Sequence, residues 1–411
     1  MLDKNKNRGV LQPYLRNVNV RWFTFDLSDL KEMRFEENET ERFDLRYGDL
    51  LICEGGEPGR AAVWKGQAEK AKFQKALHRV RFRDDEYDPT FAMYFIYYGT
   101  TTNSFAEYYT GTTIKHLTGK ALSQVQFPVP PLPEQRRIVS KIEELFSDLD
   151  AGVSALERAK ANLKRYRASV LKAAVEGRLT NLRRVPLVPL SELIEGLGQG
   201  WSPKCELNRD PDPDEWAIIK TTAVQSMAYS DQEAKPLPSE FSPRPDIEIR
   251  QGDILMTRKG PRSRCGVACL VRSTRHRLMV CDTVYRFRCR ESQVLPEYLE
   301  LALNSPTVIE EINKRKSGIS ESGLSLTHKK IGEVLIPTPA LEEQAEISND
   351  VARLLSLLES MLRTITSSDT HANRLKQSIL KLAFEGGLVT PLADQTVHSN
   401  STSASNVREE K

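Results

Sequence analysis

The sequence has no run of 18 apolar residues, and its first residues, MLDKNKNRGV, contain no apolar core. These absences argue against a membrane-spanning helix and against a signal peptide. The six cysteines are few for 411 residues and show no paired spacing, which argues against a disulfide framework. Because thiols stay reduced in the cytoplasm, we expect a cytoplasmic protein.

The sequence also has little excess of either charge. Its 59 Lys and Arg residues stand against 56 Asp and Glu, a formal net charge of +3, so the total charge does not require a nucleic-acid partner. The hydrophobic fraction of 39% and the charged fraction of 28% are typical of a soluble protein, and the length allows two to three domains. Residues 390–411, rich in Ser, Thr and Asn, are expected to be disordered.

Signatures of catalysis are scarce. No tetrapeptide resembles the Asn-Pro-Pro-Tyr that an adenine methyltransferase would need. The glycines of GLGQGW at 196–201 fail the G-x-G-x-x-G spacing of a cofactor loop, so a flexible turn is the simpler interpretation. Asp212, Glu233 and Lys235 match a nuclease's metal-binding set only loosely and lie in a Pro-rich stretch. We therefore expect no turnover by this chain.

A zinc site is the other chemistry to consider, because four cysteines fall within one segment, namely Cys265, Cys269, Cys281 and Cys289. Structural zinc usually takes closely spaced Cys pairs, and only the first two residues qualify. Buried free thiols are the preferred interpretation, and no metal site is expected.

The chain contains one segment twice. Residues 117–179 align with residues 326–388 without a gap, at an offset of 209 positions, and 21 of the 63 aligned residues are identical. An internal repeat of this kind indicates a tandem of two similar halves. Such a molecule can present two similar surfaces to a partner that itself has two similar halves, of which duplex DNA is the obvious candidate.

The repeat divides the chain into domains and helices. Residues 1–130 and 185–338 mix short β-like runs with Gly-containing turns, as mixed α/β domains do. Residues 131–180 and 339–389 are typical of long helices. Prolines up to position 133 prevent an earlier start of the first helix, and Gly177 is placed to end it.

Both helices carry apolar residues in alternating steps of four and three, the coiled-coil period. The principal seam positions are Ile138, Ile142, Leu145, Leu149, Leu156, Leu163, Ile347, Val351, Leu354, Leu358, Ile365 and Ile379. The same pattern continues through Tyr166, Met361, Leu375 and Leu382.

The alternative is a pair of separate amphipathic helices, each packed on its own domain. A helix of roughly 43 residues rises about 65 Å, however, which is too long for one small domain. We therefore expect an α/β (α+β) fold in which two mixed domains are separated by two long antiparallel coiled-coil helices with a pseudo-twofold internal repeat.

The mixed domains repeat more loosely. Tyr47-Gly48-Asp49-Leu50-Leu51 is similar to Gln251-Gly252-Asp253-Ile254-Leu255, now 204 positions apart. Each is followed by a Gly-containing turn and an apolar run. If the two domains recognise different targets, their sequences are expected to diverge while the two helices that join them stay similar.

These features resemble the specificity (S) subunit of type I restriction–modification systems. The residues that carry the resemblance are PVPPLPEQRRIVSKIEELF at 128–146, SVLKAAVEGRL at 169–179, IPTPALEEQAEI at 336–347 and SILKLAFEGGL at 378–388. The resemblance runs from about residue 7 to residue 388. It implies a non-catalytic DNA-binding subunit whose two target-recognition domains each read one half of a split, asymmetric target, and whose helices set the gap and dock the methyltransferase subunits.

The first domain departs from this pattern. The second domain opens with VPLSELIEGLGQGWSP at 188–203, ahead of a β-like run, whereas almost nothing precedes the comparable run at 14–20. The first domain is therefore shorter by roughly 25–30 residues. A late start codon and a natural truncation both fit, and whether this domain reads its half of the target is open.

Local positive charge gives the candidate DNA contacts, because Lys and Arg bind phosphates and base edges. Residues 251–290 hold ten Lys or Arg against two acids. The candidates in the second domain are Arg258, Lys259, Arg262, Arg264, Arg275, Arg277, Lys314 and Arg315. In the first domain, Arg60 and Lys115 lie in loops that the resemblance implies to face DNA. The alternative for these residues is a solvated charged surface.

The resemblance also implies the partners, which are double-stranded DNA, methyltransferase (M) subunits and a restriction and translocase (R) subunit, without a membrane. No cofactor is expected in this chain, since S-adenosylmethionine would belong to the methyltransferase subunit, and ATP and Mg²⁺ to the nuclease subunit. Two other functions stay open. One is a coiled-coil scaffold that does not bind DNA, and the other is the specificity subunit of a related system with a fused methyltransferase–nuclease.

Overall fold

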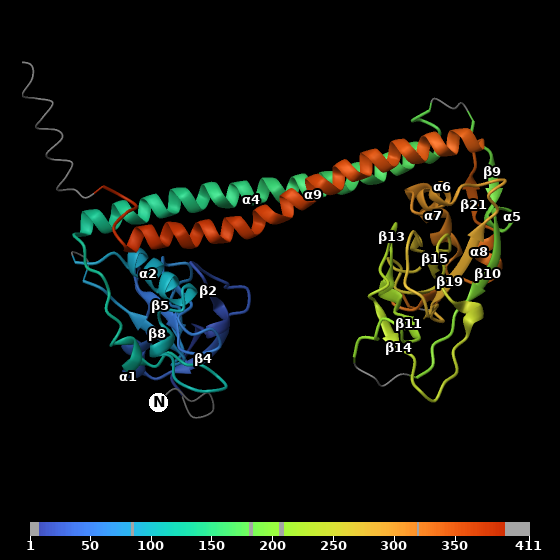
Figure 1. Ribbon diagram of the computed structural model, residues 1–411. Helices are drawn as coiled ribbons and strands as arrows, with labels where there is room; N and C mark the ends of the chain where they lie inside the picture. Colours follow the sequence, from blue (N-terminus) through green and yellow to red (C-terminus); the bar gives the residue numbers. More distant parts are fainter. Residues whose placement is uncertain (1–7, 84–85, 181–183, 205–208, 319, 391–411) are drawn as a thin grey trace, which may run out of the picture. The chain divides into compact units, whose positions relative to one another are not determined.

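The computed structural model describes residues 8–83, 86–180, 184–204, 209–318 and 320–390, so the tail expected to be disordered lies almost entirely outside it (Figure 1). The chain forms two compact units. The first contains residues up to Leu156 together with those from Thr366 onward, and the second contains Glu157–Ile365. Among the described residues no helix is both long and apolar enough to cross a membrane.

Two helices of 44 residues each, α4 (Leu132–Val175) and α9 (Leu341–Phe384), contribute one part to each unit. Both helices end before a glycine in the left-handed region, Gly177 (φ +72°) and Gly386 (φ +84°). There the amide N–H of Arg178 donates to the carbonyl of Ala173, and that of Gly387 to the carbonyl of Leu382. Glycine reaches this conformation without a steric penalty, which explains why both copies of the repeat stop at the same place.

A fully buried glutamine anchors the start of each long helix. Gln135 donates to the carbonyl of Pro130 (2.8 Å) and accepts from the amide of Asp88 (2.8 Å). Gln344 donates to the carbonyl of Pro339 (2.8 Å) and accepts from the amide of Leu295 (2.8 Å). The repeated Glu-Gln pair is therefore structural, since its glutamine ties the long helix to the start of a domain helix.

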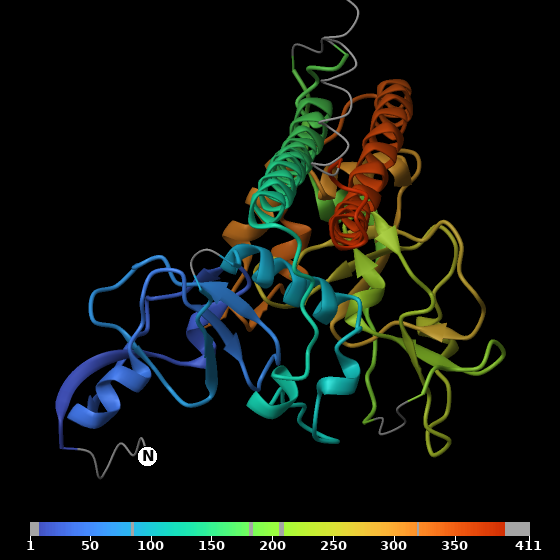
Figure 2. The same cartoon turned by 90° about the vertical axis from the view of Figure 1, so that its left-hand side faces the viewer.

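Within each unit the segments of α4 and α9 lie side by side and run in opposite directions (Figures 1 and 2). In the first unit Lys376 forms an ion pair with Asp150 (2.5 Å), and Arg137 donates to the carbonyl of Thr390. Leu380 packs in the same core as Ile142. The second unit packs residues of both helices into one core, including Val170, Leu171, Ile347, Val351 and Leu355. The antiparallel arrangement predicted from the repeat is confirmed.

Burial along the predicted seam is uneven. The twelve principal seam residues are all buried or half-buried. Tyr166, Met361, Leu375 and Leu382 are instead between 45% and 52% exposed. At the helix ends the buried face also packs against domain residues, and an α-helix drifts from a strict seven-residue repeat. Leu380 and Ala383 are buried in place of Leu382.

The first unit contains two small three-stranded sheets and a hairpin. The sheet orders are β4-β1-β7 and β6-β5-β8, and the hairpin is β2-β3. Their bounds are β1 Val10–Leu15, β2 Val20–Arg21, β3 Thr24–Phe25, β4 Lys31–Phe35, β5 Leu50–Cys53, β6 Ala61–Val63, β7 Lys72–Phe73 and β8 Leu77–Val80. The helices are α1 Glu37–Phe43, α2 Pro89–Thr101 and α3 Gly119–Leu122. Helix α2 packs its aromatic residues between β5, β6 and the long helices.

The second unit repeats this plan with additions. Strands β14 (Ala234–Pro236), β11 (Ala217–Ile219) and β18 (Leu278–Met279) reproduce the β4-β1-β7 sheet, with one antiparallel and one parallel pairing in each. A four-stranded sheet of order β10-β19-β15-β17 corresponds to β8-β5-β6 with one more strand. Its bounds are β10 Ile194–Gln199, β15 Ile254–Thr257, β17 Ala268–Leu270 and β19 Val284–Cys289.

Smaller elements complete the second unit. The hairpin β12-β13 corresponds to β2-β3, and two further pairs are β9-β21 and β16-β20. The bounds are β9 Leu187–Pro189, α5 Leu190–Leu193, β12 Val224–Gln225, β13 Ala228–Tyr229, β16 Lys259–Gly260, α6 Pro296–Leu303, α7 Pro306–Arg315, β20 Leu324–Ser325, α8 His328–Gly332 and β21 Leu335–Pro337. Two mixed domains joined by helices, as predicted, are therefore what the structure shows.

Candidate nucleic-acid interface

A tight turn in the second unit holds a buried carboxylate among arginines. Gly252 adopts φ +88°, and the following Asp253 has a side chain only 3% exposed. Its carboxylate accepts from the amide of Arg250 (2.8 Å) and from Nε of Arg288 (2.7 Å). Arg286 lies 4.0 Å from the same carboxylate and donates to the carbonyl of Asp246 (2.8 Å).

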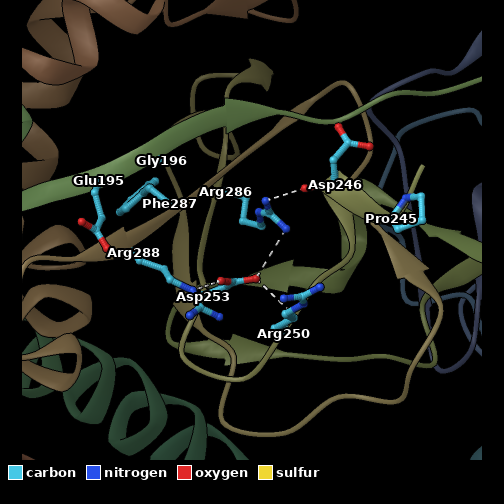
Figure 3. Close-up of a pocket in the computed structure, with 9 residues that line it drawn as sticks. All are labelled: Glu195, Gly196, Pro245, Asp246, Arg250, Asp253, Arg286, Phe287 and Arg288. Carbon is cyan, nitrogen blue, oxygen red and sulfur yellow. Dashed lines mark hydrogen bonds and ion pairs between the residues drawn. The ribbon is translucent and has the colours of Figure 1, made fainter.

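The three arginines line a cavity of about 530 Å³ (Figure 3). Figure 3 shows Arg286, Arg288 and Arg250 arranged around Asp253. The side chain of Arg250 is 66% exposed and that of Arg288 50%, so both reach solvent. Glu195 and Asp246 also line this cavity, which therefore presents both signs of charge.

The first unit repeats the same turn. Gly48 adopts φ +87°, and Asp49 accepts from the amide of Arg46 (2.7 Å). Arg81 contacts the Asp49 carboxylate with Nε (2.6 Å) and Nη2 (2.7 Å), and this hydrogen bonding raises the pKa of Arg81. We call each arrangement an Asp–Arg turn, made of Arg46, Asp49 and Arg81 in the first unit and of Arg250, Asp253 and Arg288 in the second.

The cavity beside the first Asp–Arg turn measures about 410 Å³, and its lining includes Arg46, Arg81, Arg83 and Arg136. Guanidinium groups held in place by a carboxylate keep donors that suit phosphate oxygens. The two turns are therefore candidates for contacting a nucleic-acid backbone, which would fix position rather than read sequence.

The sequence singled out the repeated Gly-Asp pair but not these arginines. Their signal was available, because an arginine stands three residues before each aspartate and another lies at the end of each partner strand, Arg81 directly after β8 and Arg288 within β19. Strand pairing brings the second arginine back to the turn, since β8 pairs with β5 and β19 pairs with β15.

The predicted contacts around the Gly260 turn have internal partners. Arg262 forms a double ion pair with Glu321 (2.8 and 2.9 Å). Arg264 donates to the side chain of Gln225 (2.6 Å) and to the carbonyls of Thr221 and Val224, so it braces the β12-β13 hairpin.

Arg258 donates to the carbonyl of Asp282 (2.9 Å) and lies over the ring of Tyr285, 5.2 Å from its centre. Lys259 is exposed. Lys259 is therefore accessible to a ligand, while Arg258 and Arg264 give the loops their shape.

Arg275 and Arg277 brace the segment before β11. Arg275 donates to the carbonyls of Pro213 and Glu215 (2.9 Å each), and Arg277 donates to the carbonyl of Asp214. These two arginines support the shape of the second unit, although parts of both residues remain at the surface.

Lys314 and Arg315 lie at the end of α7. Arg315 pairs with Glu311 (2.5 Å), and Lys314 lies 3.7 Å from the same carboxylate. Most of the predicted contacts of the second unit therefore have partners within the protein.

The two predicted contacts of the first unit differ from each other. Arg60 donates to the carbonyl of Asn17 (2.8 Å) and pairs with Glu57 (2.7 Å), and its side chain is only 14% exposed. Lys115 is exposed on the loop that precedes the repeat. Lys115 is thus better placed than Arg60 to contact a ligand.

The four cysteines considered as zinc ligands are buried free thiols. Burial raises the pKa of Cys269 and Cys289 to about 12, and it also raises that of Cys265 and Cys281. No group of three or more His, Cys, Asp or Glu side chains in the described residues is placed to hold a metal ion.

Comparison with known proteins agrees with this architecture. Residues 4–158 match the family model described as the type I restriction modification DNA specificity domain. The chain is 32% identical to the EcoEI specificity subunit of Escherichia coli over 234 residues, which span 52% of this chain but only 39% of that relative. It is 27% identical to the EcoBI specificity subunit of Escherichia coli, covering 83% of this chain and 73% of the relative.

The fold also matches a solved chain from work on complex assembly and conformational transition of the type I R-M system. That chain has a TM-score of 0.71 and 19% identity, with 94% of each chain covered. The repeat, the two mixed domains, the paired helices and these matches agree. Residues 4–158 therefore match the specificity-domain family model, and the chain is similar over most of its length to type I restriction–modification specificity subunits.

Proposed function

We propose that this chain is the DNA-specificity subunit of a type I restriction–modification complex and reads a split target with its two mixed domains. The observation that carries the proposal is the duplicated Asp–Arg turn, which presents arginines held by a buried carboxylate once in each unit. Two equivalent turns that each contact phosphate suit a duplex DNA partner, which offers an equivalent groove to each unit. Base reading would then fall to exposed loops at the other end of β5 and β15 from the turns, including those that carry Lys115 and Lys259.

The helices serve a second purpose in this proposal. Their exposed apolar side chains, among them Tyr166, Leu357, Met361, Leu375 and Leu382, are not needed to pair α4 with α9. We assign these faces to docking of the methyltransferase subunits. Leu357 is 56% exposed and Met361, one helical turn away, is 46% exposed, so the two form a continuous apolar row.

Chemistry would reside in the partners. S-adenosylmethionine belongs to the methyltransferase subunit, and ATP and Mg²⁺ belong to the translocating nuclease subunit, so this chain acts in the cytoplasm without turnover of its own.

The test is to express the chain with its methyltransferase partner and map methylated bases across the genome by single-molecule sequencing. A split motif with both halves defined is expected. A motif with one half would mean that only one domain reads DNA. Absence of methylation, together with no salt-dependent retention of the complex on DNA, would contradict the proposal and favour a scaffold.

A further inference from the structure

We propose that the first unit carries a pocket that receives an arginine side chain from a docked protein. This inference rests on the proposed function only for the identity of the docked protein, which is the methyltransferase subunit. The pocket, of about 560 Å³, lies where the β2-β3 hairpin and α2 meet the long helices, and the lining residues that carry the argument are Phe23, Tyr94, Glu143, Phe146, Asp150 and Lys376.

Aromatic rings form one wall. Phe23 sits at the tip of the β2-β3 hairpin with φ +68°, a conformation that bulky residues rarely adopt. Its ring centre lies 5.2 Å from that of Tyr94 and 4.8 Å from that of Tyr97. Tyr94 meets Phe146 edge-on at 5.8 Å. Phe23 remains 37% exposed although it packs on these rings, so the strained turn presents an aromatic surface to the pocket.

Two carboxylates form another wall. Glu143 and Asp150 flank Phe146 on α4, three residues before it and four after it, and therefore share its helix face. Burial raises the pKa of Tyr94, and both carboxylates raise it further, which is the effect of negative potential at the ring. Among the described residues no cation pairs with Glu143.

The structure already places one cation in this setting. Nζ of Lys376 lies 2.5 Å from a carboxylate oxygen of Asp150 and 5.1 Å from the ring centre of Phe146. A ring face beside a carboxylate therefore holds an ammonium group in the pocket. One lysine leaves the second carboxylate and the Phe23 ring available to another cation.

These features favour arginine on a protein over a nucleic acid. Phosphates would be repelled by Glu143 and Asp150. A planar guanidinium can stack on an aromatic face and at the same time bind a carboxylate with two donors, which an ammonium group cannot do. The pocket therefore marks this part of the first unit as a protein-binding surface.

The second unit supplies an internal comparison. The repeat aligns Glu143 with Ala352, Phe146 with Leu355 and Lys376 with Arg167. Met227, at φ +58°, takes the place of Phe23 at the tip of the β12-β13 hairpin. Leu355 and Phe146 are each 7% exposed, so the packing is equivalent while the rings and one carboxylate are missing. Helix packing alone does not require the aromatic–acidic set, which points to a separate role for it.

The experiment measures the affinity of the full-length chain for its methyltransferase subunit by calorimetric titration. Phe23→Gly removes the ring but keeps a residue that tolerates φ +68°, and Glu143→Gln removes only a charge. Each is expected to weaken binding about tenfold, as loss of a central interface contact does. Met227→Gly, the matched control in the second unit, should change it less than about twofold. Unchanged thermal melting of each variant establishes that the chain is folded.

The docked residue is identified with a photo-cross-linker, p-benzoylphenylalanine, in place of Phe23. We expect a cross-link to a methyltransferase peptide that contains an arginine. Changing that arginine to glutamine should weaken binding to the wild-type chain but should weaken binding to the Glu143→Gln variant no further. If the wild-type chain binds the methyltransferase and neither pocket variant weakens that binding, the pocket inference is wrong and the proposed function stands. If the wild-type chain does not bind the methyltransferase, the proposed function fails as well.

Discussion

The two Asp–Arg turns have the same centre but different surroundings. In the second unit β10 brings Glu195 to the cavity and the 3-10 helix Pro245–Ile247 brings Asp246, so the three arginines face two carboxylates besides Asp253. In the first unit the start of α4 supplies Arg136, and Arg83 adds another positive charge. The acidic Asp88 of that cavity is occupied in capping α2, where it accepts from the amide of Thr90 (2.7 Å).

The sheets behind the turns differ in the same way. Strand β19 pairs with β10 on one edge and β15 on the other, whereas β8 pairs with β5 and, within the described residues, with no strand on its other edge. The Asp–Arg turn nevertheless keeps its geometry in both units. The turn is therefore a fixed element, and its surroundings set the charge around it.

The largest effect is expected when the buried carboxylate at the centre of a turn is removed. Asp49→Ala and Asp253→Ala each leave arginines and a turn amide without their acceptor, which should cost about 3 kcal/mol of unfolding free energy. Thermal melting followed by limited proteolysis measures the loss and assigns it to one unit. Glu240→Ala, at an exposed position, is the control. Wild-type melting of Asp253→Ala would mean that the turn is not a structural centre.

A smaller, equal effect is expected at the two buried glutamines. Gln135→Ala and Gln344→Ala each remove one acceptor and two donated hydrogen bonds, and should destabilise the protein by about 2 kcal/mol. Chemical denaturation measures both, with exposed Gln124→Ala as the control. A clear inequality between the two variants would show that the two helix starts are not equivalent in energy.

The different surroundings of the turns predict unequal effects on DNA binding. Arg46→Ala and Arg250→Ala should each weaken binding to a non-specific duplex a few-fold and reduce the salt slope by about 1. Arg46→Ala should have the larger effect, because the cavity around it has more positive charge. Fluorescence anisotropy at several KCl concentrations measures both. Equal salt slopes for both variants and the wild type would remove the turns from the interface.

The smallest effect concerns the buried thiols. Burial raises the pKa of Cys53 in the first unit to about 11, and that of Cys269 and Cys289 in the second to about 12. The thiol pKa in the unfolded chain is near 9. Below that pH a raised thiol pKa in the folded state contributes fully to folding stability, and this stability is lost as the pH rises toward 11–12. We expect no stability change from pH 7 to 8.5 and a greater loss in the second unit above pH 9. Rapid native-state labelling by a thiol reagent at pH 8 would contradict this.

The sequence was sufficient for the helices and their partnership, because prolines, glycine stops and apolar periodicity are local signals. It was insufficient at Tyr166 and Leu382, where the buried face depends on contacts with domain residues. Arg60 shows why counting charges misplaces a site. Its partner carbonyl on Asn17 lies 43 positions away in sequence, so no local pattern reveals that the guanidinium is used inside the protein.

The central claim is that each unit reads one half of a split target on its own. The most direct measurement replaces residues 187–340 with the corresponding segment of a relative that has a known target, and maps methylated bases in cells that also carry the methyltransferase partner. The account predicts that one half of the motif changes to the relative's, while the other half and the spacing between them are retained. A change in both halves or in the spacing would contradict it.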